Sequence, residues 1–199
     1  TAGGSTKENI QPLFANLADG GFACAHNGNL INANHLREKL TKTGSIFQTT
    51  SDTETILQLV ARSKEISVEK KIIDAICKIK GAFSLVILTK DKMYGIKDVF
   101  GIRPLVIGKK NNSFILASET CALDMIGAKY IRDVENGEIV YVENKKLISL
   151  KPFPLKKIRP CVFEYIYFSR PDSILNGKCA YEYRKNFGVE LAKETSIDA

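Results

Sequence analysis

The sequence lacks any hydrophobic run that could cross a membrane. Its longest nearly apolar stretch, residues 82–88, is far shorter than the roughly 20 residues that a spanning helix needs. Residues 1–6 lack the basic and apolar regions of a signal peptide, and no starting Met is present. Either the chain is processed, or its beginning is missing. With only 6 prolines among 199 residues and 44% hydrophobic residues, disordered and fibrous classes are excluded.

The five cysteines form no CxxC pair and no regular framework. Unpatterned cysteines in odd number indicate reduced thiols and a cytoplasmic protein. The net charge of +7 is modest, and the Lys and Arg residues are scattered along the chain. A nucleic-acid interface needs a clustered basic stripe, so we expect no nucleic-acid partner and no membrane partner.

The spacing of apolar residues predicts mostly helices in the first part of the chain and mostly strands after residue 81. We expect an irregular segment over residues 1–20, a strand over 21–25 that stops at a turn over 26–29, and another strand over 46–49. Helices are expected over 32–42, from 51 onward, over 67–80 and over 119–125, and strands over 82–88, 93–96, 105–108, 113–117, 138–142 and 146–150. Hairpin-sized turns join several of these strands. The pattern predicts an α+β fold with mostly antiparallel sheet.

Two short motifs carry candidate chemistry. Asn27 and Gly28 follow a buried strand, where a carboxamide and a backbone N–H can form an oxyanion hole, although an Asn-Gly pair by itself is more typical of a plain turn. Asp52 lies in the first turn of a helix, where it can bind an ammonium group or simply favour the helix dipole. Ser51 and Glu54 around it predict a capping box.

Together these motifs carry a resemblance that neither carries alone. HNGNL at residues 26–30, followed by SDTE at residues 51–54, resembles the glutaminase domain of class II glutamine amidotransferases, which are N-terminal nucleophile hydrolases. FGIRPL at 100–105, ASET at 117–120 and CVFEYIYFSRPDS at 161–173 are similar to the amidophosphoribosyltransferase family. The resemblance implies a four-layer αββα sandwich, incomplete at the amino terminus. It also implies a partial glutaminase domain over 1–150, then a linker and lead-in to an absent phosphoribosyltransferase domain over 151–199.

The resemblance also assigns roles to residues. Asn27 and Gly28 would be the oxyanion-hole donors, Asp52 would hold the α-amino group of glutamine, and Thr1 would belong to a loop that closes over glutamine. The family's nucleophile is an amino-terminal cysteine, which this chain lacks. Cys24 is internal and is better explained as a small buried thiol. We therefore expect the 199-residue segment alone to be inactive.

The implied reaction hydrolyses glutamine and passes the ammonia to PRPP, giving 5-phosphoribosylamine in the first committed step of purine synthesis. The resemblance implies a homo-oligomer and Mg²⁺ in the absent transferase domain. It also makes Cys161 a candidate iron–sulfur ligand, although a cluster needs four ligands and a structural thiol is favoured. Two alternatives stay open: Thr1 as an amino-terminal nucleophile, and a non-catalytic amidotransferase-like binding or interaction module that keeps Asn27, Gly28 and Asp52.

Overall fold

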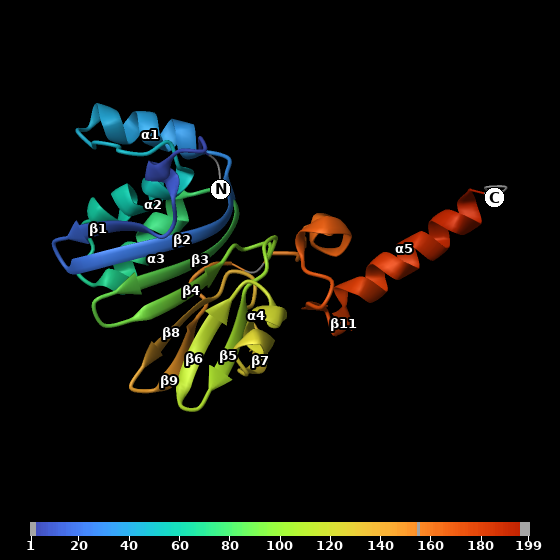
Figure 1. The fold of residues 1–199 in the computed structure, drawn as a ribbon. Coiled ribbons are helices and arrows are strands. Elements are labelled where there is room, and N and C mark those ends of the chain that lie inside the picture. Colours follow the sequence, from blue (N-terminus) through green and yellow to red (C-terminus); the bar gives the residue numbers. More distant parts are fainter. Residues whose placement is uncertain (1–2, 155, 196–199) are drawn as a thin grey trace.

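The computed structural model describes residues 3–154 and 156–195 and forms a layered α+β fold (Figure 1). Its larger sheet has six strands in the order β1-β2-β3-β4-β8-β9, and its smaller sheet has three in the order β6-β5-β7. All pairings are antiparallel, as the hairpin-sized turns predict. The larger sheet consists of β1 (Leu13–Leu17), β2 (Gly20–Leu30), β3 (Gly81–Thr89), β4 (Met93–Lys97), β8 (Ile139–Glu143) and β9 (Lys146–Leu150). The smaller consists of β5 (Val106–Lys110), β6 (Ser113–Ala117) and β7 (Lys129–Asp133).

Helices cover the outer faces of the two sheets. Three lie against the larger sheet: α1 (Ala33–Lys42), α2 (Asp52–Ala61) and α3 (Val68–Lys78) (Figure 1). The short helix α4 (Thr120–Met125) lies against the smaller sheet. A 3₁₀ turn, η1 (Lys7–Asn9), precedes β1. No helix in the described part of the chain is long and apolar enough to cross a membrane.

Three hydrophobic clusters fill the spaces between these four layers. In β3, Leu85 and Ile87 point into the cluster under the helices, whereas Val86 points into the cluster between the sheets. In β5, Ile107 joins the cluster between the sheets and Val106 packs with Leu123 of α4. This alternation is the period-2 signature of strands buried on both faces. The expected four-layer αββα sandwich is confirmed.

The amino-terminal part of the sheet differs from the sequence prediction in two ways. Residues 1–20 are not irregular throughout, since β1 pairs with β2 through a turn that places Leu17 opposite Gly20. The strand expected over 21–25 does not stop at His26 but continues to Leu30. Asn27 and Gly28 pair with Ser84 and Phe83 of β3, so they lie inside a strand and do not form a hairpin turn.

One further expectation was wrong, and one short strand was missed. Residues 46–49 form no strand, because a side chain takes the place of a partner strand for two of their amides, as described below. Strand β7 was not predicted. Four of its five residues are exposed, so it lacks the alternating apolar pattern that identifies strands.

The C-terminal segment leaves the sandwich after β9. It contains a π-helix, η2 (Glu164–Phe168), a small hairpin of β10 (Ile174–Leu175) and β11 (Lys178–Cys179), and α5 (Ala180–Glu194), which projects away from the body (Figure 1). Large apolar side chains on η2 and α5 are exposed, including Tyr167 at 78% and Leu191 at 63%. A segment that exposes several large apolar side chains is typical of an interaction face.

Candidate functional site

Gly28 occupies a position in β2 that only glycine fits. Its backbone φ is +150°, and a Cβ built there would lie 2.0 Å from the carbonyl oxygen of Ala82 and 2.9 Å from Nε2 of His26. The first distance is far below any real carbon–oxygen contact. Glycine therefore allows β2 and β3 to stay paired where the candidate oxyanion donors lie.

The side chains of Asn27 and His26 lie on opposite faces of β2. The side-chain oxygen of Asn27 is fixed by Arg103. Oδ1 accepts two hydrogen bonds from Arg103, from Nε at 3.1 Å and from Nη2 at 2.9 Å. A guanidinium only donates hydrogen bonds, so the side-chain amide nitrogen of Asn27 must point away from Arg103. The carboxamide is thus presented as a donor, as an oxyanion hole requires.

Asp52 is the first residue of α2, and only 2% of its surface is exposed. Its Oδ2 accepts a 2.9 Å hydrogen bond from the backbone N–H of Leu30, and its Oδ1 lies 3.5 Å from Nδ1 of His26. Burial raises the pKa of Asp52, but His26 and the Leu30 amide more than offset this, and the pKa lies below its usual value. The side chain is therefore a buried carboxylate.

Oδ1 of Asp52 has no hydrogen-bond partner among the residues that the structure describes. The same is true of Nε2 of His26, on the adjacent buried side chain. A buried carboxylate oxygen that accepts no hydrogen bond is costly, because the ion-pair contact with His26 at 3.5 Å does not fully replace the lost water. A group with several N–H donors, such as a substrate ammonium, would satisfy it.

The loop before α2 is fixed by Glu54, which corrects the expected capping box. Ser51 caps the helix by accepting from the N–H of Thr53, at 3.2 Å, and not from that of Glu54. Glu54 does not reach back to the Ser51 amide. Its carboxylate accepts from the backbone N–H groups of Gln48 and Thr49, both at 2.8 Å. These bonds fix the backbone of the loop that leads into α2, and so they fix the position of Asp52 at the start of the helix.

The predicted residues Asp52 and Asn27 lie on opposite faces of β2, each with a partner that was not predicted. Asp52 and His26 lie on the helix side, and Asn27 and Arg103 lie on the other side. No hydrogen bond or ion pair joins Asn27 to Asp52 in the described ranges. The two groups are nevertheless adjacent, since His26 and Asn27 are consecutive and the N–H of Leu30 bonds Asp52. The sequence prediction for Thr1 lies outside the described residues.

Cys24 is not placed to act as a nucleophile, and no cluster of metal ligands gathers around the cysteines within the part that is described. Cys24 is completely buried, and burial raises the pKa of its thiol to about 12, so it stays protonated at neutral pH. Cys161 is half-buried. Among residues 3–154 and 156–195, no three His, Cys, Asp or Glu side chains gather as they would around a metal. These residues therefore do not gather a set of three or more cluster ligands around Cys161.

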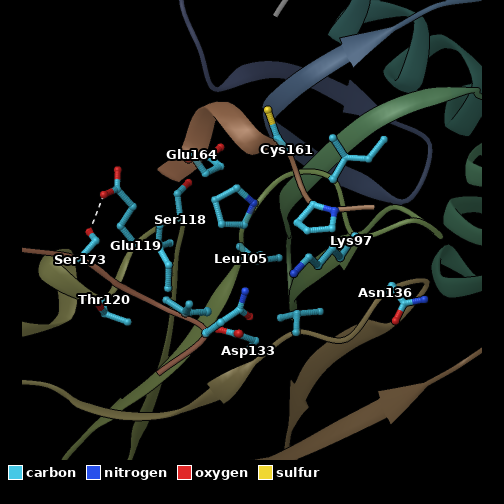
Figure 2. Close-up of a pocket in the computed structure, with 18 of the residues that line it drawn as sticks. Lys97, Leu105, Ser118, Glu119, Thr120, Asp133, Asn136, Cys161, Glu164 and Ser173 are labelled. Carbon is cyan, nitrogen blue, oxygen red and sulfur yellow. Dashed lines mark hydrogen bonds between the residues drawn. The ribbon is translucent and has the colours of Figure 1, made fainter. Parts of the chain in front are cut away.

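Cys161 and Glu164 line a cavity of about 340 Å³ between the smaller sheet and the C-terminal segment. Figure 2 shows these two side chains approaching from the C-terminal segment and Lys97 reaching in from β4. Burial lowers the pKa of Lys97. On the opposite wall, the hydroxyl of Ser173 donates to Glu119 (Figure 2). Glu164 also forms an ion pair with Arg103, 2.9 Å from Nη1, so it lies between this cavity and Asn27.

Arg103 and Glu164 were not predicted as site residues. Both belong to motifs that carry the family resemblance, but a motif in one sequence does not show which side chain it contacts. Arg103 is 76 positions from Asn27, and only the pairing of the strands brings them together.

Comparison with known proteins shows the family of this chain. A family model described as a glutamine amidotransferase domain matches residues 4–125, which is more than half of the chain. The chain belongs to the glutamine amidotransferase family. This domain is 48% identical to an amidophosphoribosyltransferase from Rhizobium etli and 47% identical to a chloroplastic one from Vigna aconitifolia. Each alignment covers 100% of this chain and 41% of the relative.

A solved structure shows the same fold. The glutamine PRPP amidotransferase from B. subtilis, complexed with ADP and GMP, is 41% identical to this amidotransferase chain and superposes with a TM-score of 0.93. The match covers 98% of this chain and 43% of that one. The amidotransferase chain therefore spans less than half the length of the proteins that it matches, and its fold is that of their glutamine domain.

Proposed function

We propose that this amidotransferase chain is the glutaminase part of an amidophosphoribosyltransferase. The whole enzyme would hydrolyse glutamine and transfer the ammonia to PRPP, giving 5-phosphoribosylamine in the first committed step of purine synthesis. The observation that carries the proposal is the buried Asp52 carboxylate, whose Oδ1 accepts no hydrogen bond from the described residues, next to a strand that presents Asn27 and Gly28. The similarity to amidophosphoribosyltransferases along the whole chain supports PRPP as the acceptor of the ammonia.

In this proposal Asp52 binds the α-ammonium group of glutamine. The buried carboxylate supplies the charge, and the ammonium supplies donors for Oδ1. Charge-assisted hydrogen bonds inside a protein are stronger than those in water, so this contact would select amino acids over simple amides. Thr1 is proposed as a further contact from a loop that closes over glutamine.

Asn27 and Gly28 are proposed to stabilise the oxyanion. When a thiolate attacks the side-chain carboxamide of glutamine, the carbonyl oxygen gains negative charge, and Nδ2 of Asn27 and the N–H of Gly28 donate to it. Collapse of this intermediate releases ammonia and leaves a thioester, which water cleaves to glutamate and the free thiol. The resemblance places that thiol on an amino-terminal cysteine. We propose that the 199-residue segment by itself releases no glutamate.

The remaining assignments follow from the same resemblance. We propose that residues 1–150 belong to the glutaminase domain and that residues 151–199 lead into a phosphoribosyltransferase domain. The exposed apolar surface of η2 and α5 supports this, because a following domain would cover it. Mg²⁺ would act in that domain. The resemblance also supports assembly as a homo-oligomer, a cytoplasmic location and a candidate cluster ligand at Cys161, and we propose these for the whole enzyme.

The test compares two ammonia sources in the full-length protein. Wild type should release glutamate from glutamine and form phosphoribosylamine from PRPP with either glutamine or free ammonia. Asn27→Ala should lower kcat for glutamine about 100-fold or more, as loss of one oxyanion donor does, and leave the ammonia-dependent reaction unchanged. The alternative of a non-catalytic binding module predicts that wild type binds glutamine and releases no glutamate.

A further inference from the structure

Arg103 is the one charged side chain that contacts Asn27 in the described part of the molecule. It comes from the connection between β4 and β5, and its Nε and Nη2 both donate to Oδ1 of Asn27, at 3.1 and 2.9 Å. Only 19% of its side chain is exposed. The contact is therefore largely removed from water, where charge-assisted hydrogen bonds have their greatest effect.

Three further contacts hold Arg103 in this place. Its Nη1 lies 2.9 Å from Oε1 of Glu164, and its guanidinium carbon lies 4.8 Å from the centre of the Phe168 ring. Its backbone carbonyl accepts a 2.9 Å hydrogen bond from the hydroxyl of Ser84, the residue that pairs with Asn27 across β2 and β3. Both the backbone and the side chain of Arg103 are thus fixed relative to Asn27.

The arrangement determines which end of the Asn27 carboxamide faces the reaction. If the amide rotated by half a turn, its NH₂ group would face a guanidinium that has no acceptor, and two hydrogen bonds would be lost. We propose that Arg103 is a positioning residue, which fixes the Asn27 carboxamide with Nδ2 directed at the oxyanion. The inference rests on the proposed function of Asn27. Arg103 itself need not touch glutamine.

The nearby positive charge has a second consequence in the same direction. Hydrogen bonds polarise one another, so an amide that accepts two bonds from a guanidinium at its oxygen becomes a better donor at its nitrogen. Arg103 would therefore lower the barrier of the step in which oxyanion charge appears. It would have little effect on the binding of glutamine in its ground state.

The experiment is a double-mutant cycle in the full-length protein, read as glutamate release. We expect Arg103→Gln to lower kcat 10- to 100-fold and to change the KM for glutamine less than 3-fold. The kcat of Arg103→Lys should lie between those of Arg103→Gln and wild type. In the Asn27→Ala background, Arg103→Gln should lower kcat less than 3-fold further, because the group that it positions is gone. Additive effects, or a change confined to KM, would overturn the proposal.

Two controls separate positioning from folding. Arg132→Gln removes another arginine with a bidentate partner, Glu138, away from Asn27, and should leave kcat unchanged. Glu164→Gln removes the ion pair of Arg103 but keeps both bonds to Asn27, so its effect should be smaller than that of Arg103→Gln. If Glu164→Gln lowers kcat as much as Arg103→Gln does, the loss is due to altered packing of η2 and the proposal is overturned. If Asn27→Ala itself leaves kcat unchanged, the proposed function of Asn27 is wrong; if it lowers kcat and Arg103→Gln does not, only this inference is wrong.

Discussion

Replacing Gly28 with Ala tests the packing of the candidate site most severely. The new Cβ would lie 2.0 Å from the Ala82 carbonyl oxygen, whereas close C···O contacts begin at about 3.3 Å. Strands β2 and β3 must therefore separate locally by about 1.3 Å. We expect the loss of about two ladder hydrogen bonds at about 1 kcal/mol each, plus about 2 kcal/mol for an alanine at this φ.

The sum, about 4 kcal/mol, corresponds to a roughly 1000-fold loss of protection of amides in β2 and β3 against hydrogen exchange. Glutamine hydrolysis should fall at least 100-fold, since the Gly28 N–H moves by more than an ångström. Hydrogen exchange of the full-length protein, followed by mass spectrometry of peptides from the two strands, measures the first effect.

Gly127→Ala is the matched control for this experiment. Gly127 also has a positive φ, +63°, but nothing lies within 4 Å of a Cβ built there. Only the backbone cost of about 1–2 kcal/mol applies, and it applies outside the site. If the two variants lose the same protection in β2 and β3, or if Gly28→Ala loses none, the steric reasoning is refuted.

Two further predictions concern parts of the fold outside the site. Hydrogen bonding from Lys92 lowers the pKa of Glu69 from 4.5 to about 2, so this contact stabilises the fold above about pH 4.5 and is lost as the pH falls toward 2. Lys92→Met should therefore cost about 1 kcal/mol in denaturant unfolding at pH 6 and almost nothing at pH 2; equal costs would contradict it. Gly188→Ala should stabilise α5 by about 1 kcal/mol and slow exchange of its amides, because no atom obstructs the added Cβ; faster exchange would contradict it.

The sequence predicts the layers of this fold better than it predicts the strand that carries the site. Helical periods and short turns are local features, and they lead correctly to α1, α2, α3 and an antiparallel sheet. Asn27-Gly28 has the local signature of a turn, yet pairing with Ser84 and Phe83 keeps it extended. Tertiary pairing overrides turn propensity here, and only a glycine permits it.

The site shows the same division between local and distant information. Asp52 at the start of a helix is readable from its neighbours, because capping and helix charge act within one turn. The contacts that determine its chemistry are with His26 and Leu30, more than 20 positions away. The bonds from Arg103 to Asn27 are more distant still. No single-sequence pattern encodes them, and only the folded chain brings these side chains together.

The proposed function depends most on Asp52 as the group that binds the α-ammonium of glutamine. Its direct test is the ratio of kcat/KM for glutamine to that for glutaramate, the same carboxamide without the amine, in the full-length protein. Wild type should favour glutamine by about 100-fold or more, since loss of a buried charge partner costs about 3 kcal/mol. Asp52→Asn, which keeps an acceptor for the Leu30 N–H, should bring the ratio to within a few fold of one, whereas Asp74→Asn on α3 should leave it unchanged. An Asp52→Asn enzyme that still favours glutamine as strongly as wild type would contradict this role of Asp52.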